Sequence, residues 1–323
     1  MTVQARAAAT IAHDGDARYE LAAFAVMVVA FLAMPFVIYP NFAMQLLCFA
    51  LFACAFNLLI GFGGLLSFGH AMFFGMGSYL SAHAASAWGL PIELAILTGM
   101  ATSLLLGVVA GLLAIRRQGI YFAMITLALA QMVYFFCLRV PFTGGENGVQ
   151  GVARGKLLGL VDLDQPLAMY YFVLAIFLAG FLLIHRIVHS PFGQVLKAIR
   201  ENEPRAISLG YRAERYKLAA FVLSAAIAGL AGATKAFVVQ NASLTDVYWA
   251  MSGEVVLMTL LGGMGTVFGP VVGALIIISM QFYLAELGAW VTIAQGVIFV
   301  VCVLAFRRGI VGELEAWLRK RRA

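Results

Sequence analysis

The chain has 323 residues, of which 63% are hydrophobic and 11% are charged, and its mean hydropathy is +0.97. Soluble domains carry roughly 45–50% apolar and about 25% charged residues, so the composition excludes a soluble globular protein. The net charge of +6 does not indicate a nucleic-acid partner, because membrane proteins collect Lys and Arg on their cytoplasmic loops.

The apolar residues form long blocks along the chain. A run of about 20 apolar residues crosses the hydrocarbon core of a bilayer as one helix, which pairs its own backbone groups. The sequence therefore predicts an all-α, polytopic transmembrane helical bundle of about ten spans in a lipid bilayer. The predicted spans are residues 20–39, 42–61, 65–87, 92–115, 119–140, 168–188, 216–239, 247–262, 265–285 and 288–306.

Two of these segments leave alternatives open. The stretch 65–87 is rich in Gly, Ser and His, and 247–262 is short and contains Glu254. Each is either a full span or a broken or re-entrant helix, which is tolerated only where protein or a cavity shields the backbone from lipid.

Loop charges predict the orientation. The connection 185–217 holds seven basic and three acidic residues, whereas the connection 139–167 holds three of each. Because cytoplasmic loops carry the excess of Lys and Arg, we expect 185–217, the turn at Arg116 and Arg117, and both termini to be cytoplasmic. The predicted organisation is a tail at 1–19, a membrane domain at 20–306 with a cytoplasmic loop at about 189–215, and a basic tail at 307–323.

Small residues recur at helix-packing spacing, as in Gly107/Gly111, Ala225/Gly229/Ala233 and Gly269/Gly273. Side chains of this size four residues apart allow helix backbones to approach closely in lipid, so a tight bundle is expected. The segment 63–69 also resembles 262–269. This echo indicates either related halves of a transporter or two ordinary glycine-rich turns.

Motifs for catalysis are missing from the sequence. It contains no GxxxxGK[ST], HExxH or GxSxG string and no His/Cys cluster at metal spacing, so we expect no enzyme activity, metal or cofactor on this chain. Acidic residues near the membrane midplane, which ion-driven carriers use, are also missing. The energy for transport is therefore expected from another subunit. Lys235 is expected to reach the interface from the outer end of its helix.

The most informative segment is the basic connection at 190–203. Pro191 suits the first turn of a helix, and Val195, Leu196 and Ile199 form a short apolar stripe beside charged residues. A short amphipathic helix of this kind either lies on lipid headgroups or docks into a groove on a partner. Spacing alone leaves both alternatives open.

Several motifs here resemble one family. They are Ser190-Pro191-Phe192-Gly193, Ala198-Ile199-Arg200-Glu201-Asn202-Glu203, Asn57-Leu58-Leu59 through Gly69-His70, Gly119-Ile120-Tyr121-Phe122 through Gln131, Thr143-Gly144-Gly145, and Gly262-Gly263 through Gly269-Pro270. Over residues 20–312 they are similar to the branched-chain amino acid ABC transporter permeases, M-type. The resemblance implies an importer of the bacterial inner membrane with a homologous second permease, two cytoplasmic ATP-binding subunits that hold ATP and Mg²⁺, and a periplasmic substrate-binding protein.

The resemblance further implies that the loop after the sixth span couples the permease to the ATPase. The residues that would take this role are Phe192, Gly193, Lys197, Arg200, Glu201, Glu203, Ala206 and Gly210. Pro204 departs from the family pattern. Because proline disfavours helix at the preceding residue, we expect two short helices there, and the role of Glu203 is in question.

Polar residues inside the spans are candidates for the translocation path: Asn57, Ser67, His70, Tyr121, Thr126 and Gln131. The alternative for each is a hydrogen bond to a neighbouring helix. The cargo also stays open between branched-chain amino acids, other amino acids, and urea or short amides. A stand-alone channel or secondary carrier is the other alternative.

Overall fold

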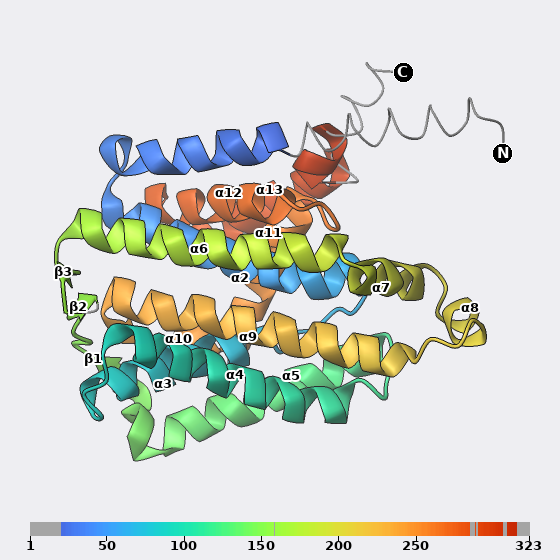
Figure 1. Cartoon of the computed structure of the whole chain (residues 1–323), viewed down its shortest axis with the longest axis horizontal. Coiled ribbons are helices and arrows are strands. Elements are labelled where there is room, and N and C mark those ends of the chain that lie inside the picture. The colour runs from blue at the N-terminus through green and yellow to red at the C-terminus, as the bar shows by residue number, and fades with distance from the viewer. Residues whose placement is uncertain (1–20, 158, 285–287, 289, 306–308, 315–323) are drawn as a thin grey trace.

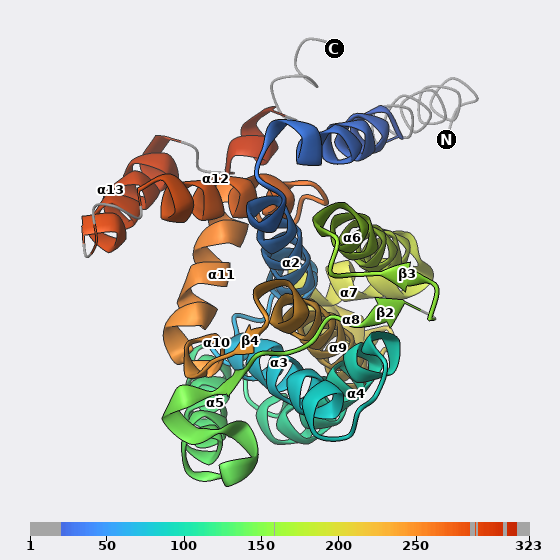
Figure 2. The ribbon, with the colours of Figure 1, turned by 90° about the vertical axis from the view of Figure 1, so that its left-hand side faces the viewer.

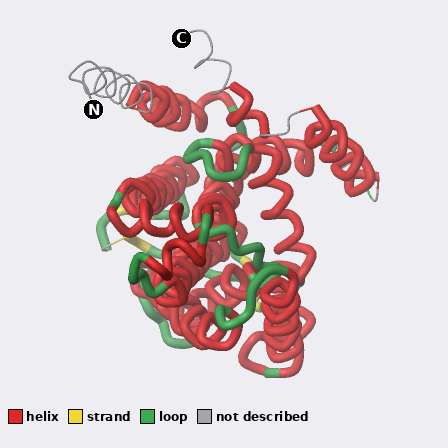
Figure 3. Tube along the Cα trace, turned by 90° about the vertical axis from the view of Figure 1, so that its right-hand side faces the viewer, coloured by secondary structure: helices red, strands yellow, loops and turns green. Residues whose placement is uncertain are grey.

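The structure is a computed structural model that describes residues 21–157, 159–284, 288, 290–305 and 309–314. Helices make up nearly all of it (Figures 1 and 3). In the first half the elements are the helix Leu21–Val37, α2 (Pro40–Asn57), the π-helix η1 (Leu58–Phe62), α3 (His70–Ser86), α4 (Ile92–Ala114), α5 (Ile120–Arg139), and the short η2 (Pro141–Thr143) and η3 (Gly145–Asn147).

The second half continues the bundle after three short strands. Its elements, with the strands that precede and interrupt it, are β1 (Val149–Gln150), β2 (Lys156–Leu157), β3 (Val161–Asp162), α6 (Pro166–His189), α7 (Pro191–Glu201), α8 (Glu203–Ser208), α9 (Ala213–Val239), β4 (Asn241–Ala242), α10 (Leu244–Val247), α11 (Trp249–Gly262), α12 (Gly269–Tyr283) and α13 (Trp290–Ala305). Residues 309–314 are also helical. Strand β1 pairs antiparallel with β4, and β2 with β3.

The helices confirm an all-α, multi-pass membrane protein. Five are long and apolar enough to cross a membrane: Pro40–Phe62, Ile92–Ala114, Ile120–Arg139, Pro166–His189 and Ala213–Val239. Other apolar helices are shorter, including Leu21–Val37, α11 and α12, so the total of ten spans stays a prediction. The predicted tail at 1–19 lies outside the described residues, as does that at 307–323 except for 309–314.

The two ambiguous segments are both shorter as helices than the sequence pattern indicated. Residues 65–69 form no helix, and α3 begins only at His70. The segment around 247–262 is split, because the short α10 ends at Val247 and α11 starts at Trp249. Tyr248 between them has extended backbone angles (φ −65°, ψ 141°), which interrupts the helix.

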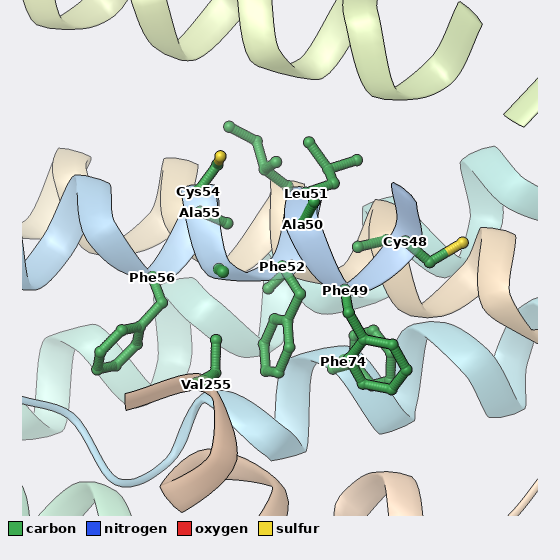
Figure 4. Close-up of a cluster of buried hydrophobic side chains, with 14 of the residues drawn as sticks. Cys48, Phe49, Ala50, Leu51, Phe52, Cys54, Ala55, Phe56, Phe74 and Val255 are labelled. Carbon is green, nitrogen blue, oxygen red and sulfur yellow. The ribbon is translucent and has the colours of Figure 1, made fainter. Parts of the chain in front are cut away.

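Helix α2 lies at the centre of the bundle, between α6, α9, α11 and α12, whereas α13 lies at the periphery (Figure 2). Helix α2 has no polar face, and a helix that is apolar all round is buried on all sides. Phe49, Phe52 and Phe56 point to one side, where the Phe52 ring lies 4.5 Å from that of Phe74, and Leu51 points to the other (Figure 4). Pro40 begins the helix, where a missing N–H costs no hydrogen bond.

Close backbone contacts hold the other helices together, as the small residues predicted. A Cβ atom added to Gly107 would stand 2.6 Å from that of Ala225, where α4 packs on α9. A Cβ atom on Gly273 would overlap the carbonyl oxygen of Met258, where α12 packs on α11. Only glycine permits these helix pairs to approach so closely.

The bundle has two distinct ends (Figure 1). At one end, which we call the α7 end, α4 and α6 finish, α5 and α9 begin, and α7 and α8 extend beyond the long helices. At the opposite end, the β end, lie the four short strands and α10. The turn at Arg116 and Arg117 thus lies at the same end as α7 and α8, and the connection 139–167 lies at the β end. The loop charges predicted this grouping of the connections.

Candidate functional site

The predicted coupling element consists of two short helices at the α7 end. Ser190 caps α7 by accepting a hydrogen bond from Gly193 N (3.4 Å), and Pro191 occupies its first turn. Asn202 then interrupts the helix and caps α8 by accepting from Arg205 N (3.0 Å), with Pro204 in the first turn of α8. The two capped starts give the predicted pair of helices, because each cap satisfies backbone donors that a helix start leaves open.

The inner side of this element is fixed to the bundle. Phe192 stacks on Tyr216 of α9 with ring centroids 5.6 Å apart. Glu203 accepts a hydrogen bond from Lys217 Nζ at 2.6 Å in a partly buried ion pair, so Glu203 holds α8 against α9. Ala206 is buried in a small apolar cluster with Ile199. The element is therefore anchored to α9.

At Gly193 the backbone of α7 packs closely against the end of α6. A Cβ atom on Gly193 would overlap the main-chain oxygen of Val188 on α6. After α8 the chain turns back at Gly210, whose φ of +91° lies in a region that favours glycine. Glu201 is exposed at the end of α7.

Two cations of α7 reach the end of the central helix. Lys197 Nζ lies 5.4 Å from the centroid of the Phe62 ring, and Arg200 Nη1 donates a hydrogen bond to the carbonyl oxygen of Gly61. The Phe62 ring and the Gly61 carbonyl both belong to the π-helix η1. The coupling element thus contacts α2 directly as well as α9.

Apolar side chains are exposed on α8 and directly after it. Leu209 is 70% exposed, Ile207 is 56% exposed and Tyr211 is 41% exposed. We call these three residues the α8 tip. Helix α8 lies beyond the ends of the long helices (Figure 1), and the three residues belong to the basic 185–217 connection. An apolar group of this kind, rimmed by charge, is typical of a surface that a partner covers.

Among the predicted path residues, Asn57 serves the packing at the α7 end. It is buried, its Nδ2 donates to the carbonyl oxygen of Thr266 (2.8 Å), and its Oδ1 accepts from Gly265 N (3.0 Å). Asn57 therefore ties α2 to the turn between α11 and α12. Its amide has the partners that a buried amide needs, which come from the turn.

Ser67, Thr126 and His70 lie together around the start of α3. Thr126 Oγ1 accepts from Phe68 N (3.2 Å) and Ser67 Oγ accepts from Gly69 N (3.2 Å). His70 is fully buried, and its Nε2 bonds Ser224 Oγ of α9 at 2.8 Å. Thr126 and Ser67 thus satisfy two backbone donors of the irregular segment 65–69, and His70 ties the start of α3 to α9.

Tyr121 and Gln131 are separate from that group. Tyr121 is 68% exposed at the start of α5, and Gln131 is partly buried further along the same helix. The predicted path residues therefore form a cluster of three around α3, a contact at Asn57, and two positions on α5.

The sequence reasoning missed an ion pair at the β end. Lys235 does not reach the interface as expected. It is 9% exposed, and its Nζ lies 2.8 Å from both carboxylate oxygens of Asp246, which is 2% exposed. Ser243 and Asp246 form a capping box at the start of α10; the Ser-x-x-Asp spacing was a signal for this helix start, but not for the ion pair.

A second cation supports the same end. Arg154 donates through Nε to the carbonyl oxygen of Phe237 (3.2 Å) and through Nη2 to that of Val238 (2.9 Å). These are among the last carbonyls of α9, which have no partner inside the helix. Buried charged side chains thus stabilise the β end. The α7 end carries the two helices α7 and α8, with the exposed α8 tip. The arrangement can transmit motion along α2 and α9.

Comparison with known proteins gives a family match over most of the chain. The sequence pattern of the branched-chain amino acid transport system permease component matches residues 38–306. The high-affinity branched-chain amino acid transport system permease protein LivM of Salmonella typhimurium is 25% identical over 324 residues, covering 92% of this chain and 76% of that protein. No solved structure matches the chain.

Two further relatives cover less. LivM of Escherichia coli is 26% identical over 277 residues, covering 79% of this chain and 65% of that protein. The ribose import permease protein RbsC of Bacillus subtilis is 30% identical over 178 residues, covering 52% of each chain.

Proposed function

The chain belongs to the family of branched-chain amino acid transport system permease components, and on that premise we propose that it is the membrane-spanning subunit of an ATP-driven importer of branched-chain amino acids. ATP is hydrolysed by two separate cytoplasmic subunits. A homologous second permease completes the pore, and a periplasmic binding protein delivers the substrate in the bacterial inner membrane. The chain carries no ATP, Mg²⁺ or metal of its own.

The observation that carries the proposal is the α7–α8 element. It is anchored on its inner side to α9 and to the end of α2, and it exposes the apolar α8 tip beyond the bundle. A lever needs both features: a surface for the partner that moves it, and fixed contacts to the helices that it moves. Docking of the tip on an ATP-binding subunit would meet both needs.

The orientation and boundaries follow from the same proposal. The α7 end faces the cytoplasm, because the basic connection 185–217 and the turn at Arg116 lie there. The membrane domain covers 20–306 in ten spans, and the segments 1–19 and 307–323 are cytoplasmic tails. The coupling loop covers about 189–215.

A different cargo is the alternative that an observation favours. A ribose import permease shares 30% identity over about half of this chain, so a related permease is named for a sugar and not for an amino acid. The buried Asn57, Ser67, His70 and Thr126 are engaged with neighbouring backbone or side chains in this conformation. Except for His70 Nδ1, which has no hydrogen-bond partner here, their polar groups would be available to a substrate only in another state.

The test is purification of the chain with its natural partners, identification of those partners by mass spectrometry, and reconstitution in proteoliposomes. We expect ATP-dependent uptake of radiolabelled leucine, isoleucine or valine that requires the binding protein. Competition by ribose, urea or short amides reports the cargo range. Uptake by the isolated chain without an ATPase would instead establish a channel or secondary carrier.

A further inference from the structure

The two cations of α7 that face the bundle both end on one structural feature. Lys197 and Arg200 are three residues apart and therefore share a face of the helix. Lys197 Nζ lies over the ring of Phe62, and Arg200 Nη1 donates to the carbonyl oxygen of Gly61. Both residues that they contact belong to η1, the last turn of the central helix α2.

The Gly61 carbonyl is a suitable acceptor because of its position. The last carbonyls of a helix have no partner inside it, and they form the negative end of the helix dipole, which favours a cation. In addition, η1 is a π-helix of five residues. Such wide turns are rare, and they occur frequently at functional sites. Arg200 thus binds the one irregular turn of the most buried helix.

Space for the Arg200 side chain comes from glycine. A Cβ atom on Gly64 (φ +69°) would stand 2.8 Å from Arg200 Cγ, and one on Gly265 (φ +77°) would stand 3.3 Å from Nη1. These two glycines belong to the two glycine-rich segments, 63–69 and 262–269, that resemble each other in sequence. The structure brings the two segments together around one arginine side chain, with Gly64 beside its aliphatic part and Gly265 beside its guanidinium.

A second side chain connects the same places. Asn57 binds Gly265 N through Oδ1 and the Thr266 carbonyl through Nδ2. The end of α2 and the turn between α11 and α12 are therefore joined independently of Arg200. A force on Arg200 acts on α2 and, through Asn57, on α11 and α12.

We infer that Arg200 is a positioning residue that transmits the motion of α7 to the cytoplasmic end of α2 and to the α11–α12 turn, instead of contacting the ATPase. This inference rests on the proposed function. The Arg200 side chain as a whole remains exposed, but its guanidinium is directed into the bundle. Arginine suits this role because its planar fork of donors holds a fixed orientation, whereas the lysine ammonium is a strongly hydrated point charge on a flexible stem.

The test uses the whole reconstituted transporter with three variants. Arg200→Gln removes the charge and Arg200→Lys keeps it. Arg116→Gln is the matched control, because it removes the same charge from an exposed position in the α4–α5 turn at the same end of the bundle. Gel filtration, co-purification of the ATP-binding subunits, ATP hydrolysis and substrate uptake are measured for each.

We expect Arg200→Gln to keep the ATP-binding subunits and to hydrolyse ATP. Uptake per ATP should fall by roughly tenfold or more, because losing a hydrogen bond from a charged group changes the equilibrium between the two states of the permease by about that factor. Arg200→Lys should be intermediate and Arg116→Gln unchanged. Spin labels at exposed positions 66 and 264, one in each glycine-rich segment, should shift their separation when ATP binds in the wild type and not in Arg200→Gln.

Two outcomes overturn the inference. One is uptake per ATP in Arg200→Gln equal to that of Arg116→Gln, and the other is loss of the ATP-binding subunits from a monodisperse Arg200→Gln permease, which would make Arg200 a direct partner contact. If Arg200→Gln aggregates, Arg200→Lys carries the test, and wild-type uptake by it overturns the inference. A wild-type transporter without ATP-dependent uptake refutes the proposed function itself, which is a distinct result.

Discussion

Removing one partner of the buried ion pair at the β end should destabilise the protein strongly. Lys235 and Asp246 are 9% and 2% exposed, and the Lys235 Nζ lies 2.8 Å from both Asp246 oxygens. Lys235→Met leaves the Asp246 carboxylate buried with only two weak contacts, to Ser78 Oγ at 3.5 Å and Ser243 N at 3.4 Å. Leaving one charge of a buried pair uncompensated costs about 3–5 kcal/mol.

The double variant Lys235→Met/Asp246→Leu should recover most of that loss, because apolar residues of similar size often replace a buried pair at little cost. The wild type, Lys235→Met, Asp246→Leu and the double variant form a double-mutant cycle. The free energy of unfolding of each is measured by SDS-induced unfolding in mixed micelles. Lys156→Met is the matched control. It removes a lysine at the same end from an exposed position opposite exposed Asp162, and it should change stability by no more than about 1 kcal/mol.

Two results would refute this reasoning. One is a Lys235→Met protein as stable as the Lys156→Met control. The other is a double variant that loses the sum of the two single losses, since additive effects mean that the two charges do not stabilise each other.

Three other changes have outcomes that the packing predicts. Gly273→Ala should cost about 1–3 kcal/mol in the same unfolding assay, because its Cβ overlaps a main-chain oxygen of α11. The control Gly253→Ala, whose Cβ would have no atom within 4 Å, should not destabilise the protein, and equal stability of the two variants would contradict this. Tyr170→Phe removes the 2.6 Å hydrogen bond to the Phe31 carbonyl and should cost about 1 kcal/mol, and an unchanged unfolding midpoint would refute it. Gly193→Val should displace α7 and reduce co-purification of the ATP-binding subunits while membrane insertion is retained; wild-type uptake by this variant would count against the lever.

The parts of the fold that depend on local sequence were predictable. Apolar runs gave the helices, because lipid requires each spanning backbone to satisfy itself. Pro191 and Pro204 predicted the two coupling helices, because first-turn prolines act within a few residues, and the structure adds Ser190 and Asn202 as their caps. The loop charges correctly grouped the connections by end of the bundle.

Contacts between distant segments could not be predicted. Asn57 stays a predicted residue of the substrate path, but the hydrogen-bond partners that it has in this structure lie 208 and 209 residues away in the chain. Lys235 looked free to reach the interface, because no pattern indicates that α10 folds back to bring Asp246 against it. In both cases a lone polar residue in an apolar run was recognisable, and its partner depended on how helices pack in three dimensions.

The central claim is that the α7–α8 element is the surface through which the ATP-binding subunits act. A photo-crosslinking residue placed at Leu209, which is 70% exposed at the α8 tip, tests it most directly in the assembled transporter. We expect a crosslink to an ATP-binding subunit, and none from the same probe at exposed Leu160 in the connection at the β end. Labelling of position 209 from the periplasm, or a crosslink to the binding protein, would contradict it.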